Sequence, residues 1–275
     1  MNCDQQHKID SSNNIKMNTH KDIRLIQLSD CHISSDNQQQ WFGRNPDMYL
    51  ENLIHYINDN EAPDSIVIAT GDLSHDGSES SYRKLSKNFS SLNKNIYTLA
   101  GNHDDLEQMA RHLNQEKIST STYFTQGNWL VLMLNTPVPD KEYGQLSEQE
   151  IIQVKKTLAK HQDKYVLIAM HHPPVRVGCA WIDNVNLQNS QAFMELVAQY
   201  KNIKAITYGH VHQDHTMAIN GVDYFACPST CHQYQSNCDD FTVDTLEAGY
   251  RWFDLRHDGH INSGVTRLPN NHHVS

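Results

Sequence analysis

Residues 95–114, NIYTLAGNHDDLEQMARHLN, join an apolar run to a helix-like run through a glycine and a short polar cluster. The same plan occurs twice earlier in the chain. IRLIQLSD (23–30) precedes the helix-like NPDMYLENLIHYIND (45–59), and SIVIATGD (65–72) precedes ESSYRKLSKNFSSL (79–92). Asn45 is suited to cap its helix, with a proline at the first helical position. Three consecutive strand–helix units predict an α/β fold with parallel strands.

The second half of the chain continues this plan. Its predicted strands and helices are WLVLMLN (129–135), LSEQEIIQVKKTLAKH (146–161), YVLIAMHH (165–172), NSQAFMELVAQY (189–200) and IKAITYGH (203–210). The first of these helices begins with a capping box, in which Ser147 is followed three residues later by Glu150. Beyond them, short alternating segments with Asn-Gly and Asp-Gly turns predict antiparallel hairpins.

We therefore expect a single domain over residues 21–268, α/β in its first three quarters and rich in β-strands at its end. Residues 1–20 are polar and lack a packing period, which predicts a disordered extension, and residues 269–275 are expected to be a tail. The sequence shows no internal repeat and no domain linker.

Bulk composition limits the partners and the location. Lys+Arg of 22 against Asp+Glu of 32 gives a net charge of -10, which disfavours nucleic acid as a ligand. No apolar run reaches the length of a signal peptide core in the first twenty residues or of a membrane span elsewhere. We expect a cytoplasmic protein, a monomer or homodimer with no membrane partner, whose six cysteines stay reduced.

Potential metal ligands follow the predicted strands where each strand ends. They are Asp30 and His32, Asp72, Asn102 beside His103, the HHPP segment, and His210 with His212. The carboxyl ends of parallel strands share one edge of a sheet, where α/β proteins build their sites. On an extended backbone, residues two apart such as Asp30 and His32 point to the same side, so each such pair is predicted to hold one cation. Carboxylate, amide and imidazole together favour Mn²⁺, Fe or Zn²⁺, and the number of ligands implies two ions.

The ordered series DCH, GD, GNHD, HHPP and GHVH resembles the calcineurin-like metallophosphoesterases. GCAWIDN, PSTC and DFTVDTLEAGYRWFDL further resemble the bacterial class III 3',5'-cyclic AMP phosphodiesterases, over residues 23–268. The resemblance implies a four-layer αββα sandwich of two mixed β-sheets with a metal pair, most often Fe and Mn, between them.

The resemblance also implies roles for individual residues. One metal would be held by Asp30, His32, Asp72 and His212, and the other by Asp72, Asn102, His171 and His210, with Asp72 bridging. The substrate would contact His32, Asp72, Asn102, His103, His171 and His212. A bridging hydroxide would attack phosphorus, and His103 would donate a proton to the leaving oxygen.

Charge counting is consistent with a phosphodiester. Two divalent ions, two carboxylates and one hydroxide leave a net charge of about +1, which a phosphodiester monoanion balances. The predicted activity is hydrolysis of 3',5'-cyclic AMP to 5'-AMP. Alternatives are other small phosphodiesters, 2',3'-cyclic nucleotides or phosphomonoesters. A non-catalytic binding protein on the same fold is a further alternative, against which the intact ligand set argues.

Several neighbouring residues allow two interpretations each. Asp104 either orients His103 or is the N-terminal acid of the following helix. His75 is a turn residue or a substrate contact, Asn45 a helix cap or a ribose contact, and Trp181 a core residue or a lid over the adenine. The CPSTCHQYQSNC segment offers Cys227, Cys231, His232 and Cys238, but it lacks the spacing of a zinc knuckle, so loop and core thiols are favoured. Cys31 is expected to point away from the metals.

Overall fold

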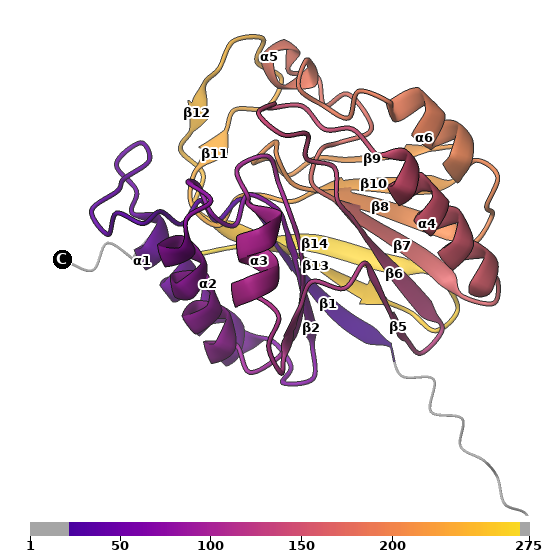
Figure 1. Ribbon diagram of the computed structural model, residues 1–275, viewed down its shortest axis with the longest axis horizontal. Coiled ribbons are helices and arrows are strands. Elements are labelled where there is room, and N and C mark those ends of the chain that lie inside the picture. The colour runs from indigo at the N-terminus through magenta and orange to yellow at the C-terminus, as the bar shows by residue number, and fades with distance from the viewer. Residues whose placement is uncertain (1–21, 270–275) are drawn as a thin grey trace, which may run out of the picture.

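The computed structural model describes residues 22–269, whose backbone forms two six-stranded mixed β-sheets (Figure 1). The predicted extension over residues 1–20 and the tail after Pro269 lie outside the described residues. The first sheet has the order β14-β13-β1-β2-β3-β4, with β1 (Ile23–Leu28), β2 (Ile66–Thr70), β3 (Asn95–Leu99), β4 (Ile118–Ser119), β13 (Gly249–Leu255) and β14 (Ile261–Arg267). The second has the order β5-β6-β7-β8-β10-β9, with β5 (Tyr123–Gln126), β6 (Trp129–Leu134), β7 (Tyr165–Met170), β8 (Ile203–Tyr208), β9 (Thr216–Ile219) and β10 (Val222–Ala226).

Helices cover the outer face of each sheet. The first sheet carries α1 (Pro46–Asn60), α2 (Glu79–Ser91) and α3 (Leu106–His112), and the second carries α4 (Glu148–Lys160) and α6 (Ser190–Val197) (Figure 1). The short helix α5 (Ala180–Asp183) lies in the loop after β7. The result is the predicted αββα sandwich.

The strands follow a two-residue period that builds three apolar layers. In β1, Leu25 faces the second sheet, whereas Ile26 and Leu28 pack beneath the helices of the first. The layer between the sheets also contains Trp129 and Phe253, which are almost fully buried. The central strands β2, β6 and β7 are apolar almost throughout because both faces of their sheets are covered.

Local signals place the helix starts as predicted. The Asn45 side chain accepts a hydrogen bond from the Met48 amide at 3.0 Å, with Pro46 as the first helical residue. Ser147 likewise caps α4 by accepting from the Glu150 amide at 3.1 Å. The capping box is not closed, because the Glu150 carboxylate accepts from the Asn135 amide instead, at 3.1 Å.

The C-terminal hairpins form, but they are divided between the two sheets. Strands β9 and β10 pair antiparallel across the turn at Asn220 and Gly221, both with positive φ, and β10 joins β8 in the second sheet. Strands β13 and β14 pair antiparallel, and β13 returns to pair with β1. A further two-stranded ribbon pairs β11 (Gln233–Tyr234) with β12 (Val243–Asp244); β12 lies in the alternating segment DFTVDTL (240–246), whereas β4, β5 and β11 lie outside the predicted strands.

Candidate metal centre

The predicted ligands converge where parallel strands of both sheets end, but through a different backbone from the one expected. Asp30, His32, Asp72, His210 and His212 all have positive φ, between 48° and 69°. The expectation of extended backbone with alternating side chains was therefore wrong. Left-handed backbone turns these side chains into the space between the sheets, at a cost of about 1–2 kcal/mol per residue.

Close backbone packing holds this conformation. The Asp30 amide donates to the Gly71 carbonyl at 3.0 Å and the His32 amide donates to the Asp72 carbonyl at 2.9 Å, so the loops after β1 and β2 are joined. A Cβ atom at Gly101 would overlap the Asp72 carboxylate, and one at Gly209 would overlap the Ser29 hydroxyl. Glycine is required at both positions because the loops approach each other so closely.

One group of donor atoms is formed by Asp30, His32 and His212. The Nε2 atoms of the two histidines are 3.2 Å apart, and that of His212 lies 3.3 Å from Asp30 Oδ1. The His212 Nδ1 donates to the His232 carbonyl at 2.9 Å, which turns its Nε2 toward the group. The His32 Nε2 also lies 3.7 Å from Asp72 Oδ2.

A second group adjoins it and includes Asp72, Asn102 and His171. The His171 Nε2 lies 3.4 Å from Asp72 Oδ1 and 3.2 Å from Asn102 Oδ1, and its Nδ1 donates to the Thr70 carbonyl at 2.9 Å. His210 is buried beside it, and its Nε2 has no hydrogen-bond partner among residues 22–269. Together the two groups bring all seven predicted ligands to one place.

This donor set fits a pair of cations. Asp30 and Asp72 are buried, and imidazole nitrogens and carboxylate oxygens face one another, so that acceptors meet acceptors unless a positive charge lies between them. Burial lowers the pKa of His32 and of His210, which keeps both rings uncharged and able to coordinate. Burial opposes ionisation of Asp72, but the neighbouring His171 holds the pKa of its carboxyl well below its usual range.

The geometry favours His171 over His172 as a ligand. Both ring nitrogens of His172 are engaged by the protein, Nδ1 with the Thr136 hydroxyl at 2.7 Å and Nε2 with the Glu142 carbonyl at 3.0 Å. Burial lowers the pKa of His172 to about 3, so the ring is neutral. It therefore supports the loop at residues 142–144 rather than the metal groups.

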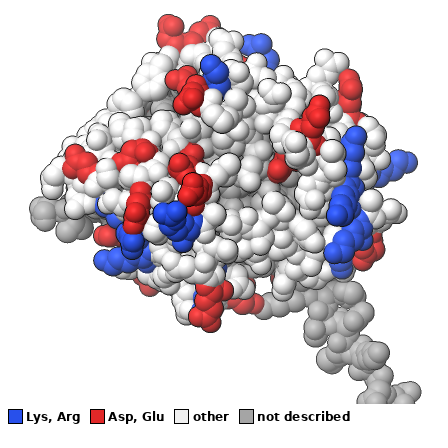
Figure 2. Space-filling view, viewed as in Figure 1, with Lys and Arg blue, Asp and Glu red and all other residues white. Residues whose placement is uncertain are grey.

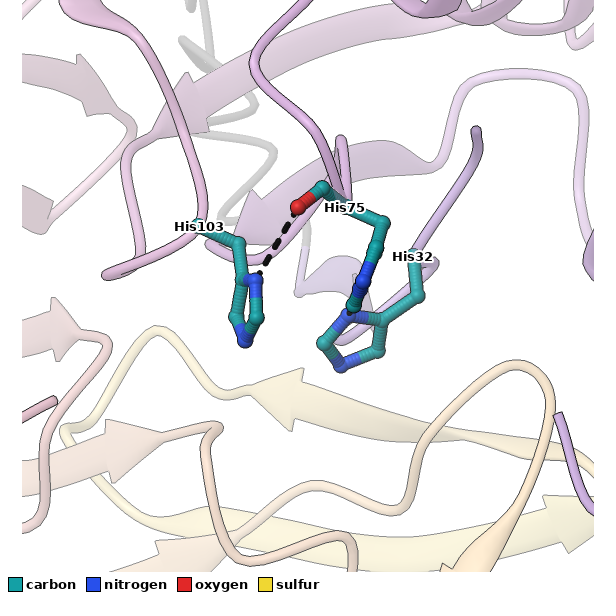
Figure 3. A group of neighbouring side chains, drawn as sticks. All are labelled: His32, His75 and His103. Carbon is teal, nitrogen blue, oxygen red and sulfur yellow. Dashed lines mark hydrogen bonds between the residues drawn. The ribbon is translucent and has the colours of Figure 1, made fainter. Parts of the chain in front are cut away.

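His103 lies at the edge of the centre in a triangle of imidazoles with His32 and His75 (Figure 3). Its Nδ1 donates to the His75 carbonyl at 3.0 Å and its backbone amide donates to Asp72 Oδ1 at 3.0 Å. The His75 ring stacks on the His103 ring with centroids 4.7 Å apart. Among residues 22–269 these hydrogen bonds engage the backbone amide and Nδ1 of His103 but not its Nε2.

Asp104 has neither of its predicted roles. Its carboxylate accepts from the amides of Leu73, Ser74 and Gly101 and from the Tyr82 hydroxyl, at 2.8–3.1 Å. Asp105 caps α3 instead, accepting from the Gln108 amide at 2.9 Å. Asp104 thus fastens the loop after β2 to the loop after β3, and burial raises its pKa to about 6.

A cleft of about 210 Å³ opens onto the two groups. One wall is polar and includes Asn102 and His103, and the other is formed by Trp181, Ile182, Val185 and Tyr234, with Glu142 at the edge. Trp181 therefore lines the cleft from α5. Nothing in the local sequence marks Tyr234 or Glu142, because they reach the cleft through long-range folding.

The cysteines of the described residues are thiols of the loops and the core, as the sequence favours, and not metal ligands. The cysteines within residues 22–269 are free, and the metal-type clusters of this region contain no cysteine. Cys31 packs in the core of the first sheet, where burial raises the pKa of its thiol to about 12.

Among residues 22–269, none of the helices has the length and apolar character that a membrane span requires.

Comparison with known proteins identifies the family. The sequence profile of the calcineurin-like phosphoesterases matches residues 23–214. The chain belongs to that family.

Relatives of this phosphoesterase extend over most of its length. It is 34% identical over 247 residues to the 3',5'-cyclic adenosine monophosphate phosphodiesterase CpdA of Haemophilus influenzae, covering 90% of each chain. It is 33% identical over 253 residues to a 3',5'-cyclic-nucleotide phosphodiesterase of Nostoc, covering 92% of this chain and 95% of the relative.

Solved structures support the fold of this phosphoesterase. A dimetal phosphatase from Danio rerio aligns with a TM-score of 0.63 at 11% identity, over 90% of this chain and 99% of the other. A purple acid phosphatase from yellow lupin aligns with a TM-score of 0.60 at 13% identity, over 90% of this chain and 54% of the other.

Proposed function

We propose that this phosphoesterase hydrolyses 3',5'-cyclic AMP to 5'-AMP. The observation that carries the proposal is the convergence of buried carboxylates and imidazoles from both sheets on one cleft, with His103 at its side. Relatives named as 3',5'-cyclic nucleotide phosphodiesterases, which match about nine tenths of the chain, support the choice of substrate.

Two sets of ligands would hold the metal pair. Asp30, His32, Asp72 and His212 would hold one ion, and Asp72, Asn102, His171 and His210 the other, as the resemblance implies. Manganese, iron and zinc all suit these donors. Two such ions supply positive charge for the phosphate and acidify a water that attacks phosphorus.

The charge that attracts a phosphate is local. The chain has a net charge of -10, and in Figure 2 acidic groups are spread over much of the face shown, while basic groups gather on its right beside α4 and also at the lower left. Asn102 would coordinate through a neutral amide oxygen, which adds no negative charge near the phosphodiester.

His103 would complete the reaction. A water molecule loses one proton to solvent as its oxygen becomes bonded to phosphorus, the bond from phosphorus to O3' breaks, and O3' takes a proton from the His103 Nε2, which solvent then restores. The His75 carbonyl accepts the Nδ1 proton, so it fixes the orientation of the ring. The product is a 5'-monophosphate with a free 3'-hydroxyl.

A nucleotide panel tests the proposal. The purified chain, loaded with Mn²⁺, is assayed by chromatography with 3',5'-cyclic AMP, 3',5'-cyclic GMP, 2',3'-cyclic AMP and p-nitrophenyl phosphate. We expect 5'-AMP to form fastest. Faster turnover of a 2',3'-cyclic nucleotide or of the monoester, or none of cyclic AMP by metal-loaded protein, would reject the proposal.

A further inference from the structure

Four aromatic side chains continue outward from the metal centre. We call Phe42, Trp181, Tyr234 and Phe241 the aromatic wall. Tyr234 stacks on His212 with centroids 4.2 Å apart and planes 14° apart, so the wall begins at a predicted ligand. Trp181 and Phe241 contact Tyr234 edge-on at 5.0 and 5.2 Å, and Phe42 lies 5.8 Å from Phe241.

Three separate segments build this wall. Phe42 comes from the loop before α1, Trp181 from α5, and the other two rings from β11 and the loop before β12. Arg44 joins the first and last of these segments, donating to the carbonyls of Cys231 and Thr245 at 3.0 and 3.2 Å.

The outer part of the wall is exposed although exposure of large rings is unfavourable. Phe42 and Phe241 are 55% and 49% exposed, and Phe42 has a φ of 53°, which is rare for a bulky residue. Phe42 and Gly43 are the two central residues of the turn closed by the Trp41–Arg44 bridge, and such two-residue turns have positive φ at both positions. The wall thus begins with Tyr234 and Trp181, which line the cleft, and continues into the exposed rings of Phe241 and Phe42.

We propose that the aromatic wall binds the base of the cyclic nucleotide, an inference that rests on the proposed function. With the phosphate at the two ligand groups, the rest of the substrate must extend along the cleft. The apolar side of that cleft starts with Tyr234 and Trp181. Stacking on aromatic rings accepts any base, because every base has a π-face, so the wall contributes affinity for a nucleotide rather than a choice between adenine and guanine.

The first test compares substrates that differ only in the base. Wild-type enzyme is assayed with cyclic AMP and with an abasic ribose 3',5'-cyclic phosphate. We expect the abasic compound to have a KM higher by roughly 10-fold and a similar kcat, since the base is held away from the reacting atoms. Equal KM values with good turnover of both compounds would contradict binding of the base by the aromatic wall and would leave the proposed function intact. Turnover of neither would overturn both.

The second test changes the wall. Trp181→Ala should raise the KM for cyclic AMP roughly 10-fold and leave the abasic compound unaffected, while Trp181→Phe stays near wild type because a ring remains. Phe241→Ala, at an exposed position, should raise KM by roughly 3- to 5-fold, and Phe241→Tyr should restore it. Ile152→Ala, at an exposed apolar residue of α4, is the matched control.

Two results would contradict the inference. One is an equal change for both substrates in the wall variants, which would indicate a general disturbance of the site. The other is an unchanged KM in the Phe241→Ala variant together with an altered mass in light scattering, which would make the exposed rings an interface between copies of the chain.

Discussion

The layer between the sheets and the edge where their strands end obey different rules. Between the sheets, apolar side chains such as Trp129 and Phe253 are packed without exposure, and the buried Gln27 donates to the Thr70 hydroxyl at 2.8 Å. At the edge, five residues are left-handed and the His210 Nε2 lacks a partner. The interior is arranged for stability, and the edge keeps strain and unsatisfied groups where a metal and a substrate can use them.

The largest change in activity should come from a substitution at the edge where the strands end. His103→Ala should lower kcat for cyclic AMP roughly 10²- to 10⁴-fold because the leaving oxygen loses its proton donor. Elemental analysis should find the wild-type metal content, and the melting temperature should stay close to that of the wild type. His260→Ala, on the exposed turn between β13 and β14, is the control and should change neither rate nor stability. Unchanged turnover in His103→Ala would assign proton donation to another group.

A substitution between the sheets should have the opposite outcome. Phe253→Ala removes a fully buried ring and should lower the free energy of unfolding by about 3–5 kcal/mol, measured in urea. Below the unfolding transition, kcat per folded molecule should match the wild type. A large loss of kcat in folded protein would show that the two regions are coupled.

Metal should stabilise the edge. Mn²⁺ at a free concentration of 100 times its dissociation constant should raise the free energy of unfolding by about 2.7 kcal/mol, and a chelator should reverse this change. In Asp72→Asn the increase should be much smaller, since the predicted bridging carboxylate is gone. Equal stabilisation of both proteins would place the metal elsewhere.

The smallest effect should come from a helix end near the site. Asp105→Ala removes the side-chain cap of α3 and should cost about 1 kcal/mol in unfolding experiments, with kcat unchanged. Glu107→Ala, on the exposed face of the same helix, should cost less than about 0.5 kcal/mol. Equal costs would show that the cap is not what stabilises this helix.

Local pattern was enough to predict the strand ends and the helix caps. Asn45 and Ser147 act where their spacing predicts, and the residues after each apolar run do meet at one edge. The backbone of those residues could not be predicted, because left-handed φ at Asp30 or His212 is imposed by loops distant in the sequence. The role of Asp104 could not be predicted for the same reason. Its hydrogen-bond partners Leu73 and Ser74 come from the loop after β2, which is distant in the sequence.

Pairing of β1 with β13 has a consequence for how the protein is made. Ile23 lies opposite Leu255, and the Arg24 guanidinium bonds to the Asp254 carboxylate at 3.0 Å. At about 5–20 residues per second, a ribosome adds the second of these strands roughly 10 to 50 s after the first. Throughout that interval the nascent chain has an open sheet edge at β1, so the first sheet is completed only after β13 has been synthesised.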